Sequence, residues 1–426
     1  MPKQTISKTT RLQGKPVIPG DKSISHRGLI FGAIADGKTE VTDILESEDV
    51  QSTARCLKQM GVDIVKKGNI TYVDGIGVKG FKPPTGTLDC GNSGTSMRVL
   101  MGLLAGRGVT ATLTGDSSLV KRPMKRVAEP LRLMGANITL TNQDYAPLTI
   151  VGTKLHGIDY NLKIASAQIK TAIIMAGLTA EGTTRVTGEI HSRDHTERML
   201  DYFGAEVSNK PEAFSIVGGQ KLHGSKVRVP GDPSTAAFWV AAGSLVRGAH
   251  VVMENVALNP TRIGFIKVLE RMGAKISTTM TSERPEPVGT IEVRSAELKG
   301  VTVTEDEVPS MIDEIPMLAV LATQAHGVTE VSGAEELRVK ETDRLEAVAT
   351  NLRAMGCQID LRHDGFRIEG PQKLRGASVQ SFHDHRIAMA FSIAGLVAEG
   401  PVEVNGSECV AISYPNFYET LAELTK

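Results

Sequence analysis

The sequence predicts an α/β protein of two domains, built from six βαβαββ repeats with three in each domain. Three observations carry this prediction: the length of 426 residues, an internal repeat, and a change from helix-like to strand-like patterning within each repeat. A chain of this length exceeds one ordinary hydrophobic core, so at least two domains are expected. The hydrophobic content of 41% supports folded cores rather than disorder.

One recurring segment has the form of a helix end. Five similar segments, such as LKQMGVDIV from Leu57 and LERMGAKIS from Leu269, place a glycine after an amphipathic turn and before a strand-like run. Glycine suits this position because the residue after a helix commonly needs a left-handed backbone. These glycines recur at intervals of 69 to 83 residues: Gly61, Gly135, Gly204, Gly273 and Gly356.

A second recurring segment has the form of a helix start. Each copy has a polar beginning, an apolar helix, a glycine-bearing exit and a short β-like run. The six copies begin at Gly20, Gly91, Ala165, Gly231, Ile312 and Phe382. We therefore expect units ordered strand, helix, strand, helix, strand, strand, with the sheets inside or between the helices. The expected domains are 1–20 plus 241–426 and 21–240, with the active site in the cleft between them.

Composition and charge exclude several classes of protein. The 48 basic and 48 acidic residues cancel, which argues against a nucleic-acid partner. The N-terminus has no apolar leader, and the longest apolar stretch, about Ile387–Ala398, is shorter than the ~18–20 residues that span a bilayer. We expect a soluble, cytoplasmic protein with no membrane partner.

Metal and cofactor sites find little support. The four cysteines are far apart and form no CxxC pair: Cys56, Cys90, Cys357 and Cys409. This pattern favours reduced, buried thiols over zinc or disulfides. The pairs His383/His385 and His191/His195 lack an accompanying set of carboxylates or thiolates, so we expect solvent-facing or anion-binding histidines and no metal.

Two nucleotide-binding patterns occur in the wrong context. Residues 32–39, GAIADGKT, match the phosphate-loop pattern, but a helix precedes them and a strand follows, the reverse of what that loop requires. Residues 75–80, GIGVKG, match G-x-G-x-x-G, but the paired prolines that follow cannot open a helix. We infer neither an ATP site nor a dinucleotide site.

The six helix starts favour anion binding. Capping residues stand at or near each one: Asp21–Ser23, Asn92–Thr95, Ser166, Asp232–Ser234, Asp313 and Asp384. Helix N-termini present free N–H groups and a positive dipole end. A role as simple caps is the alternative for each copy, but basic residues beside three of the six favour an anion site.

Seven short motifs occur along nearly the whole chain: GDKSISHR from Gly20, GNSGTSMR from Gly91, KRPM from Lys121, SAQIK from Ser166, DEIP from Asp313, LRVKETDR from Leu337 and DHR from Asp384. In these motifs and in their order, the chain resembles the family of 5-enolpyruvylshikimate-3-phosphate synthases. The variants SAQIK and SRDHTERML resemble the second bacterial class of the family. Gly94 is retained where some glyphosate-tolerant forms have alanine, so tolerance is not implied.

The resemblance implies an inverted α/β barrel of two domains, the enolpyruvyl transferase fold, and an enzyme without metal or organic cofactor. The implied substrates are shikimate 3-phosphate and phosphoenolpyruvate, joined by addition and elimination with release of phosphate. Together they carry about five negative charges. Helix dipoles contribute under ~1 kcal/mol each, so concentrated basic side chains are needed. We expect a monomer.

The resemblance also assigns residues. Asp313 is expected to act as base toward the 5-hydroxyl, Glu341 as proton donor and acceptor at C3, and Lys22 to touch both substrates. The expected shikimate 3-phosphate contacts are Lys22, Ser23, Arg27, Ser166, Ala167, Gln168, Asp313 and Lys340. The expected phosphoenolpyruvate contacts are Lys22, Gly94, Arg122, Gln168, Arg344 and Arg386. Second-rank candidates are Asn92, Thr95, Arg98, Lys170, Arg193 and His385.

Each assignment has a plainer alternative. Asp313 could cap a helix, Glu341 could serve as a first-turn dipole partner, and a basic side chain could be a solvated surface charge. For Lys170, a solvent charge and a phosphate contact are equally favoured. One family feature is missing, since Cys409–Pro415 lacks the lysine that many members carry before the C-terminal aromatic-Pro pair.

Two other functions stay open. The first is enolpyruvyl transfer to UDP-N-acetylglucosamine, but that family has a cysteine-bearing loop before its Arg-Pro motif, and Gly115–Pro123 has no cysteine. The second is a non-catalytic phosphosugar-binding protein, which would need the basic residues but not the Asp313/Glu341 pair.

Overall fold

A computed structural model of the chain describes residues 2–77 and 80–426. The chain forms two compact units, which we call unit 1 (residues 1–19 and 230–426) and unit 2 (residues 20–229). The boundary expected at 240 is wrong, because it falls inside helix α7 (Pro233–Leu245), whereas the chain enters unit 1 at Pro230. Each unit has its own hydrophobic core.

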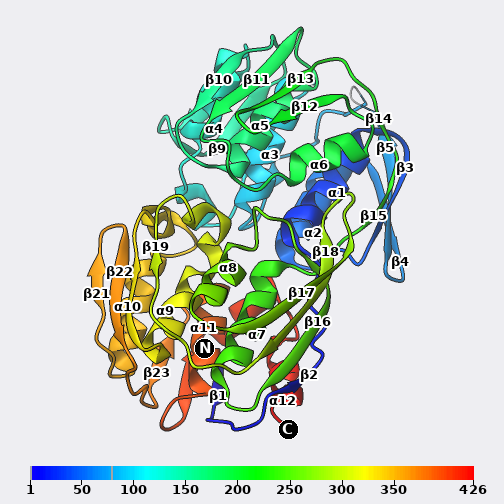
Figure 1. Ribbon diagram of the computed structural model, residues 1–426. Helices are drawn as coiled ribbons and strands as arrows, with labels where there is room; N and C mark the ends of the chain where they lie inside the picture. Colours follow the sequence, from blue (N-terminus) through cyan, green and yellow to red (C-terminus); the bar gives the residue numbers. More distant parts are fainter. Residues whose placement is uncertain (1, 78–79) are drawn as a thin grey trace. The chain divides into compact units, whose positions relative to one another are not determined.

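Six sheets carry the repeats (Figure 1). In unit 2, the first sheet has the strand order β14(Leu222–His223)-β3(Ala35–Thr42)-β5(Ile70–Ile76)-β4(Asp63–Lys67), and β15 (Lys226–Arg228) also pairs with β3. The second sheet has the order β6(Leu88–Asp89)-β7(Thr110–Thr114)-β9(Tyr145–Val151)-β8(Asn137–Thr141). The third has the order β10(Asp159–Leu162)-β11(Thr183–Gly188)-β13(Ala213–Val217)-β12(Val207–Lys210). In unit 1, one sheet has the strand order β17(Lys275–Ser282)-β18(Val288–Arg294)-β16(His250–Ala257)-β2(Gln13–Gly14). The next has the order β19(Thr302–Val303)-β20(Gly327–Val331)-β22(Gly365–Gly370)-β21(Asp360–Arg362). The last has three strands in the order β1(Lys3–Ile6)-β24(Val402–Asn405)-β23(Ser378–Gln380).

Two kinds of helix alternate along the chain. The helices buried around almost their whole circumference are α1 (Lys22–Ile34), α3 (Gly94–Ala105), α5 (Ala167–Gly177), α7, α9 (Ile315–Gln324) and α11 (His385–Gly395). The helices with one exposed face are α2 (Glu48–Gln59), α4 (Lys125–Leu133), α6 (His195–Tyr202), α8 (Gly264–Arg271), α10 (Arg344–Ala354) and α12 (Phe417–Leu424). A helix that is apolar all round is stable only in an interior.

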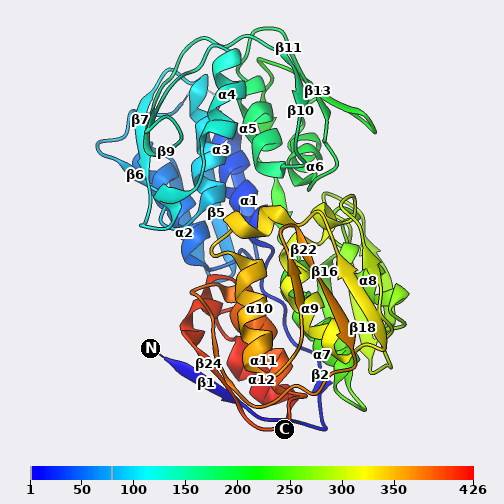
Figure 2. The ribbon, with the colours of Figure 1, turned by 90° about the vertical axis from the view of Figure 1, so that its left-hand side faces the viewer.

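The helices therefore lie inside each unit and the sheets outside (Figure 2). In β8, for example, buried and exposed residues alternate, so one face of its sheet meets solvent. The expectation of sheets inside or between the helices is wrong, because the first helix of each repeat has no polar face to turn outward. The inverted α/β barrel implied by the family resemblance is confirmed.

Each unit completes its sheets with a strand from a distant part of the chain. Strand β2 precedes α1 in sequence but pairs in parallel with β16 of unit 1. Strand β15 precedes α7 but pairs in parallel with β3 of unit 2. The sixth repeat lacks its last hairpin, and the N-terminal strand β1 pairs antiparallel with β24 instead. Strands that precede one repeat in the sequence thus complete the sheet of another repeat.

Local predictions of backbone conformation are confirmed. The five helix-end glycines have φ between 83° and 98°, a range that side chains with a Cβ disfavour. Helix α1 precedes Gly37 and strand β3 contains it, so the context that argued against a phosphate loop is present. Within the G-x-G-x-x-G match, Val78 and Lys79 lie outside the described residues. No helix in the described part of the chain is both long and apolar enough to cross a membrane.

Candidate active site

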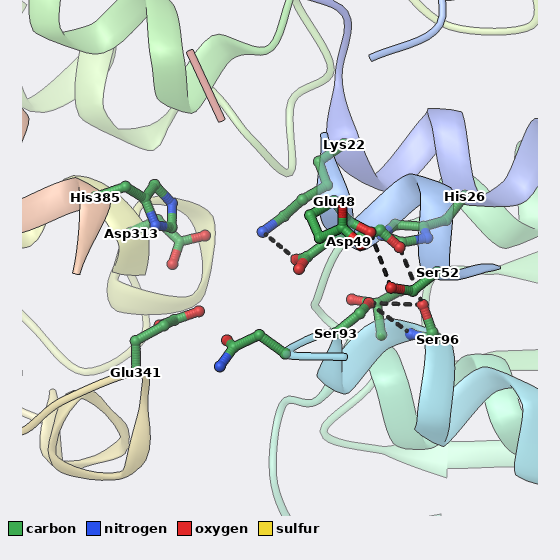
Figure 3. Close-up of polar contacts among 12 residues, drawn as sticks. Lys22, His26, Glu48, Asp49, Ser52, Ser93, Ser96, Asp313, Glu341 and His385 are labelled. Atoms are coloured by element: carbon green, nitrogen blue, oxygen red, sulfur yellow. Dashed lines mark hydrogen bonds and ion pairs between the residues drawn. The ribbon is translucent and has the colours of Figure 1, made fainter. Parts of the chain in front are cut away.

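In unit 2, the start of α1 carries Lys22 beside a carboxylate. The Asp21 side chain caps the helix by accepting a hydrogen bond from Ile24 N at 2.8 Å. The Lys22 ammonium donates to Asp49 Oδ2 at 3.1 Å (Figure 3). The Lys22 side chain is 19% exposed to solvent and the Asp49 side chain is 11% exposed. A partly exposed ammonium that is paired with a carboxylate can also serve an incoming anion.

A buried chain of hydroxyl groups supports the helix starts beneath Lys22. His26 Nδ1 bonds Thr53 Oγ1 at 2.8 Å, and Thr53 Oγ1 bonds Ser96 Oγ at 2.6 Å. Ser96 Oγ donates to Ser93 Oγ at 2.7 Å. Burial lowers the pKa of His26 to about 3, so its ring is neutral at physiological pH. These hydrogen bonds hold α1, α2 and α3 together at one end of unit 2.

Ser93, rather than Asn92, caps helix α3. Its Oγ accepts from Ser96 N at 3.0 Å, which frees the Asn92 side chain. Asn92 Oδ1 then accepts from Arg122 Nη2 at 2.9 Å. Arg122 reaches the first turn of α3 in this way, and a Cβ added at Gly94 would lie 3.6 Å from Arg122 Nη1. The structure thus brings Asn92, Gly94 and Arg122 together, as the motif order suggests.

The start of α5 carries the SAQIK motif. Ser166 caps this helix by accepting from Ile169 N at 3.4 Å, and Ala167 is its first residue. Gln168 is half-buried and accepts from Arg98 Nη1 at 2.5 Å. It also donates from Nε2 to Thr95 Oγ1 at 3.1 Å. Both second-rank candidates on α3 are therefore joined to Gln168.

Arg27 is a buried link between helices. Its Nε donates to Thr196 Oγ1 at 2.8 Å, its Nη2 to Thr171 Oγ1 at 2.8 Å and its Nη1 to Ser23 O at 3.0 Å. A plain surface role for Arg27 is excluded by its 4% exposure. The side chain ties the start of α1, next to Ser23, to α5 and α6.

Of the two equal alternatives for Lys170, the solvent charge is wrong. The side chain is 2% exposed, and its Nζ lies 2.6 Å from Glu197 Oε1. It also donates to Ile190 O at 3.0 Å and Ser192 O at 3.4 Å. Lys170 therefore holds the segment that leads to Arg193, which is half-buried.

For two histidines, the structure excludes the solvent-facing alternative and leaves anion binding as a prediction. His195 and His385 are 0% and 1% exposed, because each begins a helix, α6 and α11, that packs into its unit. His191 and His383 are exposed. Among residues 2–77 and 80–426, no cluster of three or more His, Cys, Asp or Glu side chains has an arrangement that could hold a metal ion.

In unit 1, one arginine gathers three carboxylates. Arg344 is the first residue of α10 and is 1% exposed. Its Nη1 donates to Asp313 at 2.9 Å, its Nη2 to Glu341 at 2.8 Å and its Nε to Asp384 at 2.7 Å. Burial alone would lower the pKa of Arg344, but the three carboxylates raise it well above its ordinary value. The guanidinium therefore stays charged and fixes the positions of Asp313 and Glu341. Figure 3 shows the side chains of these two carboxylates.

The plainer alternatives for these two carboxylates are wrong. Glu314, and not Asp313, is the N-cap residue of α9, and Asp313 lies in the preceding 3₁₀ turn, Ile312–Glu314. Glu341 lies before Asp343, the N-cap of α10, and so outside the first helical turn. Neither carboxylate is placed by helix capping, and each turns to Arg344 instead.

Two further cations lie in unit 1. Burial lowers the pKa of Lys340, and nearby Asp313 partly offsets this effect. Arg386, at 3% exposure, follows the cap of α11, where Asp384 Oδ1 accepts from Arg386 N at 2.8 Å. The Nε and Nη1 atoms of Arg386 are buried without a hydrogen-bond partner among the described residues. A buried donor without a partner is costly, so these N–H groups suit an anionic ligand. His385 Nδ1 lies 4.0 Å from Asp384 Oδ1.

Sequence reasoning missed several supporting residues. Asp49, His26 and Thr53 lie outside the predicted site residues, and Asp384 was named as a cap and as part of the DHR motif but not as a site residue. Their signal in sequence is weak, since a helix-start acid or a buried histidine has many ordinary uses. At the C-terminal departure from the family pattern, Tyr414 is fully buried and donates to Val17 O at 2.9 Å.

The two units of repeats, with charged groups at the starts of the buried helices, define the enolpyruvyl transferase fold. An enolpyruvyl transferase from Streptomyces tendae has this fold, with a TM-score of 0.80 at 17% identity and coverage of 99% of this chain and 96% of that one. The chain belongs to the EPSP synthase (3-phosphoshikimate 1-carboxyvinyltransferase) family, whose model matches residues 6–421.

Individual relatives agree with the family match. A 3-phosphoshikimate 1-carboxyvinyltransferase of Bacillus thuringiensis (strain Al Hakam) is 48% identical over 417 residues, covering 97% of each chain. That of Bacillus subtilis (strain 168) is 46% identical over 98% of this chain and 99% of its own length. The solved EPSP synthase from Acinetobacter baumannii matches with a TM-score of 0.89 at 44% identity, over 99% and 98% of the two chains. The expectation of a transferase of this family is confirmed.

Proposed function

We propose that the chain transfers the enolpyruvyl group of phosphoenolpyruvate to the 5-hydroxyl of shikimate 3-phosphate and releases phosphate, as a step of the shikimate pathway. The observation that carries this proposal is the pairing of Asp313 and Glu341 on the Arg344 guanidinium. A protein that only bound phosphosugars would have no need of two carboxylates fixed beside each other.

Charge supports the assignment of the two substrates. The pair of polyanions requires several cations, and arginine can grip carboxylate or phosphate through two N–H groups. Unit 2 offers Lys22 and Arg122, and unit 1 offers Lys340 and Arg386, whereas the charge of Arg344 is already matched by three carboxylates. The unpartnered Nε and Nη1 of Arg386 favour its role toward phosphoenolpyruvate. The half-buried Lys340 favours shikimate 3-phosphate, because a weakly solvated ammonium binds an anion strongly.

The reaction needs proton transfers at two places, the 5-hydroxyl and C3. In the addition, the 5-hydroxyl loses its proton as its oxygen bonds C2, and C3 gains a proton. In the elimination, C3 returns a proton as the C2–O bond to phosphate breaks. We assign Asp313 to the hydroxyl proton and Glu341 to the C3 proton. Arg344 holds both carboxylates by one hydrogen bond each, so their separation is fixed before substrate arrives.

Finer assignments belong to the same proposal. The motifs SAQIK and SRDHTERML support membership of the second bacterial class. The four cysteines are buried and unbridged, which supports a reducing compartment such as the cytoplasm. We propose that the chain acts as a monomer and needs no metal or organic cofactor.

A phosphate-release assay tests the proposed function. The purified chain, treated with chelator, is given phosphoenolpyruvate with shikimate 3-phosphate or with UDP-N-acetylglucosamine. Release of phosphate only with shikimate 3-phosphate is the expected result. Release with the nucleotide sugar, or calorimetric binding of shikimate 3-phosphate without any turnover, would overturn the proposal.

A further inference from the structure

Arg98 and Gln168 form a contact that the assigned roles do not explain. Arg98 lies on α3 at 6% exposure, and its Nη1 donates to Gln168 Oε1 of α5 at 2.5 Å. The charge-assisted bond is stronger than one between neutral groups. A second contact fixes the other end of the same amide, because Gln168 Nε2 donates to Thr95 Oγ1 at 3.1 Å.

These two contacts set which way the Gln168 amide faces. Thr95 and Arg98 are three residues apart on α3, so their side chains share one helix face. The guanidinium can only donate, and a reversed amide would point its NH₂ group at these N–H donors. The amide oxygen is therefore held at Arg98. One Nε2–H is used by Thr95, and the second has no hydrogen-bond partner among the described residues.

Arg98 is itself held in place from the other side. Its Nη2 donates to the carbonyl oxygen of Pro123 at 3.2 Å. Pro123 follows Arg122 directly in the sequence. The guanidinium thus bridges the Arg122 segment and the start of α5. The first residue of α3, Gly94, lies close to the guanidinium, because a Cβ added there would be 3.1 Å from Arg98 Nη1. The missing side chain at Gly94 therefore leaves space for the same nitrogen that holds Gln168.

We propose that Arg98 is a positioning residue that acts through Gln168. It fixes the carboxamide so that the second Nε2–H points to an anionic oxygen of the bound substrates. This inference rests on the proposed function, because Gln168 serves there as a contact between the two ligands. It adds a reason for glycine at position 94: a Cβ there would crowd the Nη1 of the arginine that orients Gln168.

A double-mutant cycle tests the inference. Arg98→Lys keeps the charge but cannot make both the Gln168 and the Pro123 contacts. We expect it to raise the KM for phosphoenolpyruvate about tenfold, in the range of a lost charge-assisted bond, with a smaller change in kcat. Gln168→Ala should show a loss at least as large. In the double variant the loss should equal that of Gln168→Ala alone, because Arg98 then has nothing to orient.

A matched control separates positioning from folding. Arg107 is a buried arginine just beyond the same helix, and it donates to Leu103 O. Arg107→Lys should lower the Tm without moving the KM. If Arg98→Lys proves too unstable to assay, Thr95→Val removes the other amide contact and leaves the buried charge in place. Its effect on KM should also disappear in the Gln168→Ala background.

The outcomes are distinct. Losses from Arg98→Lys and Gln168→Ala that multiply in the double variant would overturn the inference, because Arg98 would then act independently of Gln168. An unchanged KM in Arg98→Lys would overturn it as well. Either result obtained with an active wild-type enzyme leaves the proposed function standing. A wild-type chain that releases no phosphate with shikimate 3-phosphate overturns the proposed function itself.

Discussion

Arg344 and Asp384 are joined by a hydrogen bond of 2.7 Å between side chains that are 1% and 0% exposed. Through this bond the first residue of α10 is tied to the N-cap of α11. The same guanidinium holds Asp313 and Glu341, so one buried cation organises the acidic half of the proposed chemistry. The stability of unit 1 and its activity are therefore linked at Arg344.

Arg344→Met is expected to destabilise the protein strongly. Removing one partner of a buried ionic cluster leaves uncompensated carboxylates, at a cost of about 3–5 kcal/mol. Urea unfolding measures the change in the free energy of unfolding. Arg271→Met serves as control, because its ion pair with Glu307 is 47% and 29% exposed and is worth about 0–1 kcal/mol. Equal losses in the two variants would show that the cluster carries no special stability.

Asp313→Asn and Glu341→Gln should reduce turnover while the fold remains intact. Each replacement keeps an oxygen that can accept from Arg344, but it cannot take up a proton at the reacting atoms. We expect kcat to fall by about 10²–10⁴, with unchanged circular dichroism and Tm within a few degrees. Asp343→Asn is the control, since asparagine also caps helices and Asp343 is assigned no proton transfer. Full turnover in either test variant would remove that residue from the mechanism.

His26 should make stability depend on pH. Its pKa of about 3 in the folded chain lies below the ordinary 6.5, mainly through burial; Asp49 and Asp21 oppose the shift, and Lys22 and Arg27 add to it. Between these two values the unfolded chain binds the extra proton, so this contribution to stability is full above pH 6.5 and is lost as pH falls toward 3.

The measurement compares wild type with His26→Asn in urea at pH 7.5 and 5.5. Wild type should lose about 1.4 kcal/mol relative to the variant at the lower pH, one pH unit below the unfolded pKa. His326→Asn, at an exposed position, should show no such difference. A constant gap between wild type and His26→Asn at both pH values would mean that His26 titrates normally.

Lys340 should limit activity at alkaline pH. Burial lowers its pKa below the ordinary 10.5, so in the free enzyme the ammonium loses its charge earlier than a surface lysine would. The kcat/KM for shikimate 3-phosphate should then fall as pH rises through that lowered pKa. Arg stays charged in this range, and Lys340→Arg should move the fall to higher pH even if its absolute activity is lower. Identical alkaline profiles would assign the fall to another group.

Local features were predictable from sequence because they depend on neighbouring residues. The five helix-end glycines, the cap at Ser166 and the reversed context of Gly37 follow from spacing and backbone preferences. Arg27 and Arg98 lie on mostly apolar helices and are 4% and 6% exposed. The seven motifs in order added the family, its inverted fold and its reaction.

Tertiary packing decided the rest. Whether Lys170 would meet solvent or Glu197 depended on a residue 27 positions away in a separate helix, α6. The pairing of β2 with β16 and of β15 with β3 could not be predicted from the repeats, because the partner of a parallel strand is its neighbour in space. The sequence alone determined which residue types recur at the helix starts. Only folding decided which carboxylate or amide each cation meets, because ion pairs and hydrogen bonds depend on distances of a few ångströms between segments far apart in the chain.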